Sequence, residues 1–163
     1  MRIPLIALSL SALILTGCSS TDADGFAVDG SCDGVAVEIS FSGEAERIET
    51  CVEISGKTEV AKDVLGLAGV SIEGTKAYGD AVVCRVNGIP SATEELLVEG
   101  EDPYLETCEE FPPAFAYWAL WIKKSDNDPW EYASEGVSSL QLAKGQSVGL
   151  AFSLGGKTPT PSE

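Results

Sequence analysis

Four aromatic side chains on one face of a predicted hairpin are the residues of this sequence best suited to bind a ligand. The run 115–123 alternates as an extended strand, which places Trp118 on one face and Tyr117 and Trp121 on the other. A turn at 125–129 and a short strand at 130–134 add two more rings. The small residues of a closing strand at 147–153 would leave a flat seat beside them. We predict a binding site of Tyr117, Trp121, Trp130 and Tyr132, with Arg85 available for a carbonyl or phosphate group.

The same rings have a second interpretation, as a layer of the core. A sheet that carries one helix covers only one of its faces. The aromatic face would then either pack under the irregular acidic segment 91–113 or stay open to a ligand. Both interpretations stand on the residues alone.

The common catalytic and metal-binding motifs are missing from the sequence, and a pair of carboxylates for general acid and base catalysis is the one alternative left open, because the sequence does not give their separation in space. It contains no histidine, which excludes Ser-His-Asp and Cys-His catalysis and histidine-based zinc sites. It also lacks a nucleophile elbow, a phosphate loop and a dinucleotide fingerprint. Asp126, Asn127 and Asp128 offer oxygen ligands, but the EF-hand glycine and glutamate are missing and Pro129 favours a solvated turn. We predict a protein that is not an enzyme and that has no metal site and no resident cofactor.

The N-terminus has the pattern of a bacterial lipoprotein signal. Arg2 precedes an apolar run from 3 to 15 that is too short to span a bilayer, and the run ends in Leu15-Thr16-Gly17-Cys18, which resembles a lipobox. The alternative is an ordinary secretory signal. We predict a signal peptide at 1–17, acylation of Cys18 with diacylglycerol and chains such as palmitate, and a flexible tether at 18–31. The domain would then be held at the outer face of the cytoplasmic membrane.

The other four cysteines, Cys32, Cys51, Cys84 and Cys108, are an even number in an exported chain, which indicates two disulfides. Three pairings are open. We favour Cys32–Cys51 and Cys84–Cys108, because sequence neighbours most easily lie side by side. A four-cysteine metal site would prefer ligands two to four residues apart, and no two of these have that spacing.

Periodicity predicts mostly strands and one helix. Thr58 is a plausible N-cap, Val60, Val64 and Leu67 fall on one helical face, and Gly69 would end the helix. The predicted fold is α+β, one main helix on a mixed sheet, with a domain at 32–154 and a disordered tail at 155–163. The strands are expected at 35–42, 49–54, 81–86, 115–123, 130–134 and 147–153.

A series of short motifs resembles a known family. In order they are the helical segment 60–69, Tyr78-Gly79, Cys84-Arg85-Val86-Asn87-Gly88, Ala116-Tyr117-Trp118, Trp130-Glu131-Tyr132, Gly136-Val137, Leu142, Gly145 and Val148. Together they resemble the transcobalamin-like C-terminal domain, the β-domain of the vitamin B12 carriers intrinsic factor and transcobalamin. The resemblance covers roughly 35–154. It implies a β-grasp-like sheet with one helix and a role in capping a corrinoid. In the carriers a helical barrel completes the site, and this chain has no room for one.

These observations favour a lipid-anchored, extracytoplasmic binding protein on the cell surface that captures a small ligand for uptake, with a corrinoid as the candidate. A separate helical or transporter chain would complete the site. The alternative is a non-catalytic module for contacts with another surface protein, or a scaffold. Nucleic acid is not expected as a partner, because 26 acidic against 10 basic residues give a formal charge of -16.

Overall fold

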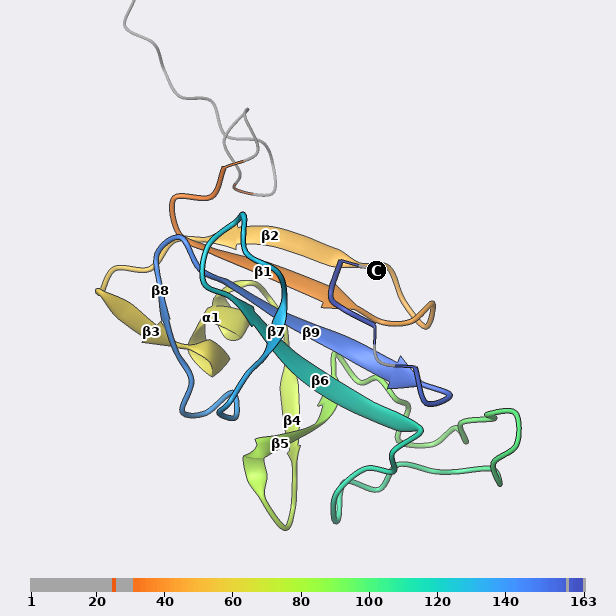
Figure 1. Cartoon of the computed structure of the whole chain (residues 1–163). Helices are drawn as coiled ribbons and strands as arrows, with labels where there is room; N and C mark the ends of the chain where they lie inside the picture. Colours follow the sequence, from red (N-terminus) through yellow and green to blue (C-terminus); the bar gives the residue numbers. More distant parts are fainter. Residues whose placement is uncertain (1–24, 26–30, 158, 163) are drawn as a thin grey trace, which may run out of the picture.

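The computed structural model describes residue 25 and residues 31–157 and 159–162 (Figure 1). The predicted signal peptide at 1–17, Cys18 and most of the predicted tether lie outside these residues. Within the described part, no helix has the length and apolarity needed to cross a membrane. The elements in chain order are β1 (Val35–Ser40), β2 (Ile48–Val52), β3 (Thr58–Val60), α1 (Ala61–Leu67), β4 (Ile72–Thr75), β5 (Gly79–Val86), β6 (Ala116–Lys123), β7 (Glu131–Tyr132), β8 (Gln141–Ala143) and β9 (Ser147–Leu154).

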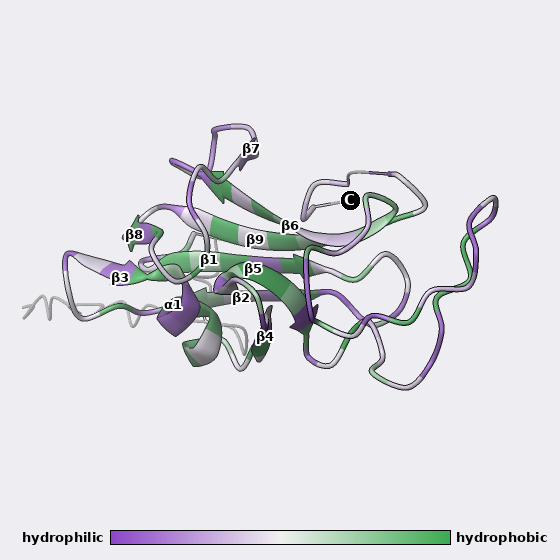
Figure 2. Cartoon of the chain, turned by 90° about the horizontal axis from the view of Figure 1, so that it is seen from below, coloured by the Kyte–Doolittle hydropathy of each residue, from purple (hydrophilic) through white to green (hydrophobic). Residues whose placement is uncertain are grey.

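A five-stranded mixed sheet in the order β2-β1-β9-β6-β7 is the main element of the fold. The first strand, β1, pairs in parallel with the last, β9, and every other pairing in this sheet is antiparallel. Two small ladders, β3 with β8 and β4 with β5, complete the strands. Figure 2 shows α1 and the β4–β5 hairpin on one side of the large sheet.

The core lies between the large sheet and this layer. Val37, Ile39, Val148, Leu150 and Phe152 are fully buried where β1 and β9 face α1 and β5. The inward-facing residues of β1 and β9 thus alternate as expected. The outward-facing residues of β1 differ from the prediction, because Glu38 and Ser40 are also buried, at 9% and 6% exposure. We expected β1 to be half-buried, and it is covered on both faces.

The predicted fold class is wrong. Strands make up 38% and the helix 5% of the described residues, so the chain is mostly β rather than the β-grasp-like α+β fold that we expected. Thr58 does not cap the helix, because Thr58–Val60 forms β3 and pairs with β8. The helix therefore begins only at Ala61 and has seven residues. We had predicted that residues 58–60 form the first turn of the helix, and they form β3 instead.

The end of α1 matches the prediction. Gly69 has a φ of 75°, a conformation that glycine adopts without strain. Its N–H donates to the carbonyl of Gly66, and the N–H of Val70 donates to the carbonyl of Leu65. These two bonds form a Schellman motif, which ends the helix and satisfies its last carbonyls. Leu67 lies outside the core, with 65% of its surface exposed.

Both disulfides of the favoured pairing are present, Cys32–Cys51 and Cys84–Cys108. The first joins the chain ahead of β1 to β2. The second joins β5 to the long segment between β5 and β6. Cys84 and Cys108 are both 2% exposed, whereas Cys32 and Cys51 are partly accessible.

We expect the two disulfides to differ in their effect on stability. Replacing Cys84 and Cys108 together by alanine should lower the free energy of unfolding by about 3.5 kcal/mol, because a closed loop of 24 residues is lost and two buried side chains are truncated. Replacing Cys32 and Cys51 should cost about 3 kcal/mol or less. Urea denaturation of the two double variants measures both free energies of unfolding. A larger loss of stability on removing Cys32–Cys51 would contradict the prediction that the buried Cys84–Cys108 disulfide contributes more.

Candidate binding groove

The four predicted aromatic residues come together on one face of β6. Tyr117 and Trp130 pack on a small cluster made by Ala119, Trp121 and Ala151. Tyr132 pairs with Trp121 across β6 and β7, and their rings stack with centroids 4.0 Å apart and planes at 20°. The alternation along β6 thus predicted which rings share a face.

That face is covered in the structure. Pro161 is fully buried and lies so close to Gly149 that a Cβ on the glycine would be 2.3 Å from the proline Cγ. The Trp130 Nε1 donates to Ser162 Oγ at 2.6 Å, and Ser162 Oγ lies 3.2 Å from a Glu38 carboxylate oxygen. Pro161 and Ser162, part of the segment expected to be a disordered tail, therefore lie on β9 and β1 beside Trp130.

Charged side chains close the same face further. Lys123 Nζ lies 4.6 Å from the centre of the Trp130 ring, and it is 3.9 Å from Glu38. Trp121 is only 7% exposed. The flat seat expected on this face is thus covered at Gly149 by Pro161 and at Trp130 by Ser162 and Lys123. Tyr117, Trp121 and Trp130 belong to a small second core cluster, whereas Tyr132 is 55% exposed and stacks on Trp121.

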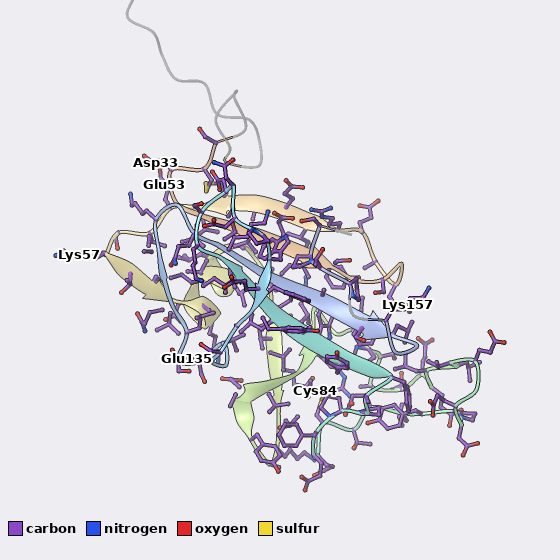
Figure 3. All side chains as sticks on the ribbon, in the orientation of Figure 1. Asp33, Glu53, Lys57, Cys84, Glu135 and Lys157 are labelled. Carbon is purple, nitrogen blue, oxygen red and sulfur yellow. A yellow bond between two sulfur atoms is a disulfide. The ribbon has the colours of Figure 1, made fainter. Side chains whose placement is uncertain are left out.

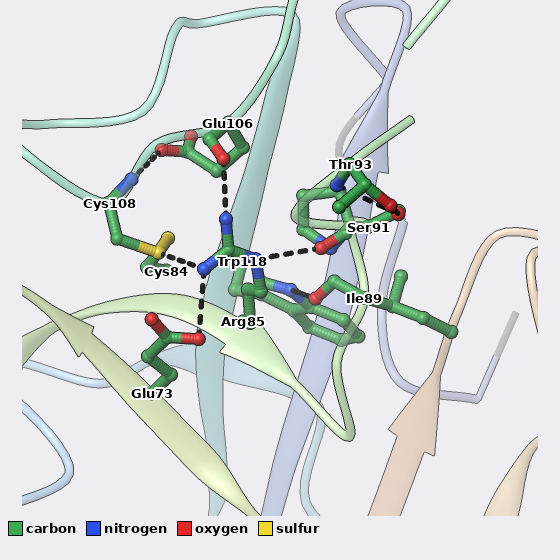
Figure 4. A network of polar contacts seen from close by, with 10 residues as sticks. Glu73, Cys84, Arg85, Ile89, Ser91, Thr93, Glu106, Cys108 and Trp118 are labelled. Carbon is green, nitrogen blue, oxygen red and sulfur yellow. Dashed lines mark hydrogen bonds and ion pairs between the residues drawn. A yellow bond between two sulfur atoms is a disulfide. The ribbon is translucent and has the colours of Figure 1, made fainter. Parts of the chain in front are cut away.

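Arg85 is not brought to the four rings. It is 6% exposed, and its guanidinium is surrounded by the segment that follows β5 (Figure 4). Its Nε donates to the carbonyl of Pro90 at 2.9 Å, and its Nη2 donates to the carbonyl of Glu106. Its Nη1 donates to a Glu73 carboxylate oxygen at 2.9 Å and lies 2.8 Å from Cys108 Sγ. All these contacts are structural, so Arg85 orders the 87–115 segment.

Glu106 lies beside this arginine and has its own partners. Its carboxylate is 3% exposed and accepts hydrogen bonds from the Tyr104 hydroxyl at 2.9 Å and the Cys108 N–H at 2.7 Å. Cys84, Glu106 and Cys108 bring three potential metal-ligand atoms together, but both cysteines are committed to the disulfide. Burial, followed by the hydrogen bond and the negative charge of Glu106, raises the pKa of Tyr104 to about 12.

A groove of about 540 Å³ lies along the outer edge of β6, on the side that does not pair with β9. Sequence reasoning identified only Tyr117 among its residues as a site residue. Apolar side chains predominate in its walls, and Glu135, labelled in Figure 3, lies on the loop that follows β7. The lining consists of Ala81, Val82, Val83, Phe111, Pro112, Ala114, Tyr117, Trp118, Leu120, Ala133, Ser134, Glu135, Gly136 and Val137.

Specific contacts fix the walls of this groove. Gly136 lies directly against β5, since a Cβ there would be 2.8 Å from the carbonyl oxygen of Ala81. Phe111 is 62% exposed, and its ring lies 4.3 Å from that of Tyr78. The ring of Trp118 is held in the core by a bond from its Nε1 to the carbonyl of Ile89 at 2.9 Å. The groove depends on which side of β6 is a sheet edge. Hydrophobic periodicity identifies β6 as a strand but does not show which strands pair with it.

The chain has no match among family models, curated proteins or solved structures. The assignment of the groove therefore depends on its geometry.

Trp118 and Trp121 provide a matched test of buried hydrogen bonding. Both are 7% exposed, but among the described residues the Trp121 Nε1 has no hydrogen bond partner. Phe in place of Trp118 removes a satisfied bond, whereas Phe in place of Trp121 removes an unsatisfied buried donor. We expect Trp118→Phe to lower the free energy of unfolding by about 2 kcal/mol more than Trp121→Phe. Urea denaturation measures the difference, and equal losses would contradict the pattern.

Tyr104 predicts a loss of stability at high pH. The folded chain holds its phenolic proton more tightly than the unfolded chain, because the pKa rises from 10.0 to about 12. The resulting stabilisation is present below pH 10 and is lost as the pH rises from about 10 to about 12. The free energy of unfolding should fall more steeply over this interval in the wild type than in Tyr104→Phe. Parallel curves for the two proteins would refute the raised pKa.

Proposed function

We propose that this chain is a lipid-anchored, non-catalytic binding protein of the outer face of the cytoplasmic membrane, and that it holds its ligand in the groove along β6. The observation that carries the proposal is the groove itself. Its volume of about 540 Å³ lies within the usual range for ligand pockets, roughly 300 to 1,000 Å³. Its apolar walls and few polar groups are typical of such pockets.

The covered aromatic face supports the groove over the site first expected from the sequence. A ligand on the aromatic face would have to displace Pro161 from Gly149 and Ser162 from Trp130, whereas Tyr117 and Phe111 line the groove without any displacement. Among the expected ligand-binding residues, Tyr117 is thus the one that we retain in the proposed site.

A corrinoid stays the first small molecule to test, because of the family resemblance. A groove open on one side would hold only one edge of such a ring, which fits the expectation that a separate helical or transporter chain completes the site. The alternative function is a module for contacts with another surface protein. One observation favours it: the groove runs along a strand edge, and strand edges accept peptide backbones.

The proposal is tested with the full chain in detergent micelles, by equilibrium dialysis against the water-soluble corrinoids cobalamin and cobinamide. We expect micromolar or tighter binding of at least one of these probes. Ala81→Trp should weaken that binding by tenfold or more, because Ala81 is an exposed residue of the groove wall and a larger ring fills the space.

Leu97→Trp is the matched control. It adds the same side chain at a position that is 79% exposed and does not line the groove, so binding should be unchanged. Equal effects of the two variants, or binding that neither of them changes, would place the ligand elsewhere.

A further inference from the structure

Within the described part of the chain, the outer edge of β6 carries backbone groups that have no hydrogen bond partner. In an antiparallel strand the N–H and C=O groups of successive residues point alternately to the two sides. The N–H of Gly155 donates to the carbonyl of Phe115 at 2.7 Å, so 115, 117, 119 and 121 point to β9. The backbone groups of 116, 118 and 120 therefore point away from β9, to the side on which the groove lies.

Described residues satisfy the backbone groups at the two ends of this edge. The N–H of Ala116 donates to the carbonyl of Pro113 at 3.0 Å, and the carbonyl of Leu120 accepts from the N–H of Ala133 at 2.9 Å. Between them lie the carbonyl of Ala116, both backbone groups of Trp118 and the N–H of Leu120. None of these four groups has a hydrogen bond partner within 31–157 and 159–162. They present the alternating acceptors and donors that an added strand requires.

The surroundings of this edge favour a slender occupant. The segments 111–114 and 133–137 flank the edge, and β5 forms the opposite wall. A second copy would present a β6 edge recessed between the same segments, so two such edges could not meet directly. The shared negative charge of two copies opposes that contact as well.

Charge indicates the chemistry of the occupant. Glu135 lines the groove, and Glu109 and Glu110 immediately precede Phe111 of its wall. Lys76 pairs with Glu109. On a chain with a formal charge of -16, a basic segment is attracted and an acidic one repelled. The apolar walls at Val83, Phe111 and Val137 suit small apolar side chains at alternate positions.

Resting on the proposed groove function, we propose that the ligand is an extended segment of another protein, with alternating basic and small apolar residues, that adds as a strand to β6 at 116–120. The backbone of this segment forms hydrogen bonds with the backbone of 116–120. Its apolar side chains enter the groove, and its basic side chains face Glu135, Glu109 and Glu110. One peptide binds per chain.

The test uses the full chain in detergent micelles and the peptide acetyl-Lys-Val-Lys-Val-Lys-Val-amide. Calorimetry should give one site with a dissociation constant of about 10 to 100 μM at low salt, at least tenfold weaker for the peptide with glutamate in place of lysine. Ala81→Trp should abolish the binding and Leu97→Trp should not. Binding that ignores the charge of the peptide or the Ala81→Trp change overturns the inference.

N-methylation of the peptide tests the strand geometry directly. In an extended peptide the N–H groups of the lysines lie along one edge and those of the valines along the other. Methylating one of these sets should weaken binding tenfold or more, and methylating the other should leave it unchanged. Equal loss in both peptides, or no loss in either, overturns strand addition.

Hydrogen exchange identifies the edge that is used. Bound peptide should slow exchange of the Trp118 and Leu120 amides at least tenfold in a ¹⁵N-labelled chain, with the mass by light scattering remaining that of one copy. Protection at the β2 edge instead, or a doubled mass, overturns the inference. If the peptide does not bind but a corrinoid binds in an Ala81-dependent way, the groove function stands and strand addition fails. Small-ligand binding that Ala81→Trp leaves unchanged contradicts the groove function itself.

Discussion

The parallel pairing of β1 with β9 is the constraint on which the rest of this structure depends. It brings the first strand and the last strand of the domain together in the middle of the sheet, in register from Ala36 and Ser147 to Ser40 and Ala151. Because β9 has one side on β1, its other side takes β6, and β6 then has an outer edge that only the short β7 covers in part. The groove exists because no strand pairs with the outer edge of β6 between 116 and 120 within the described residues. As the two central strands, β1 and β9 are also covered on both faces, by the core layer on one side and by Pro161 and Ser162 on the other.

Arg85 positions the segment that leads to Phe111, which forms one wall of the groove. Pro90 and Glu106 are sixteen residues apart in the chain, and one buried guanidinium bonds to the carbonyl of each. A planar group with five donors suits this task better than an ammonium group would. Together with the Cys84–Cys108 disulfide it holds the segment that leads to Phe111 against β5. A charged residue first considered for ligand recognition thus acts on the shape of the site from beneath it.

Much of the strand layout could be predicted from the sequence, because alternation is a local signal. Val35, Val37 and Ile39, and likewise Val148, Leu150 and Phe152, point inward as their spacing predicts. The stop at Gly69 and the pairing of the cysteines were also predictable, since each depends on chain conformation or sequence proximity.

What the sequence could not predict depends on distant partners. The sequence at Thr58–Val60 resembles the first turn of a helix, but these residues pair with the distant strand β8 and form β3 instead. The aromatic face was correctly grouped, but proline and serine near the C-terminus cover it, and their polar, turn-like composition gives no sign of burial. Arg85 resembled a ligand-binding residue, because its carbonyl partners lie on irregular backbone that has no pattern.

The Cys32–Cys51 disulfide has a mechanical consequence. A pull on the chain ahead of residue 32 reaches Cys51 through the sulfur bridge, so the loop between the two cysteines cannot be drawn out. That loop contains all of β1 and most of β2, including the strand that pairs with β9. Force from the N-terminal side therefore passes from Cys32 to Cys51 and bypasses β1, so it does not peel this central strand from the sheet.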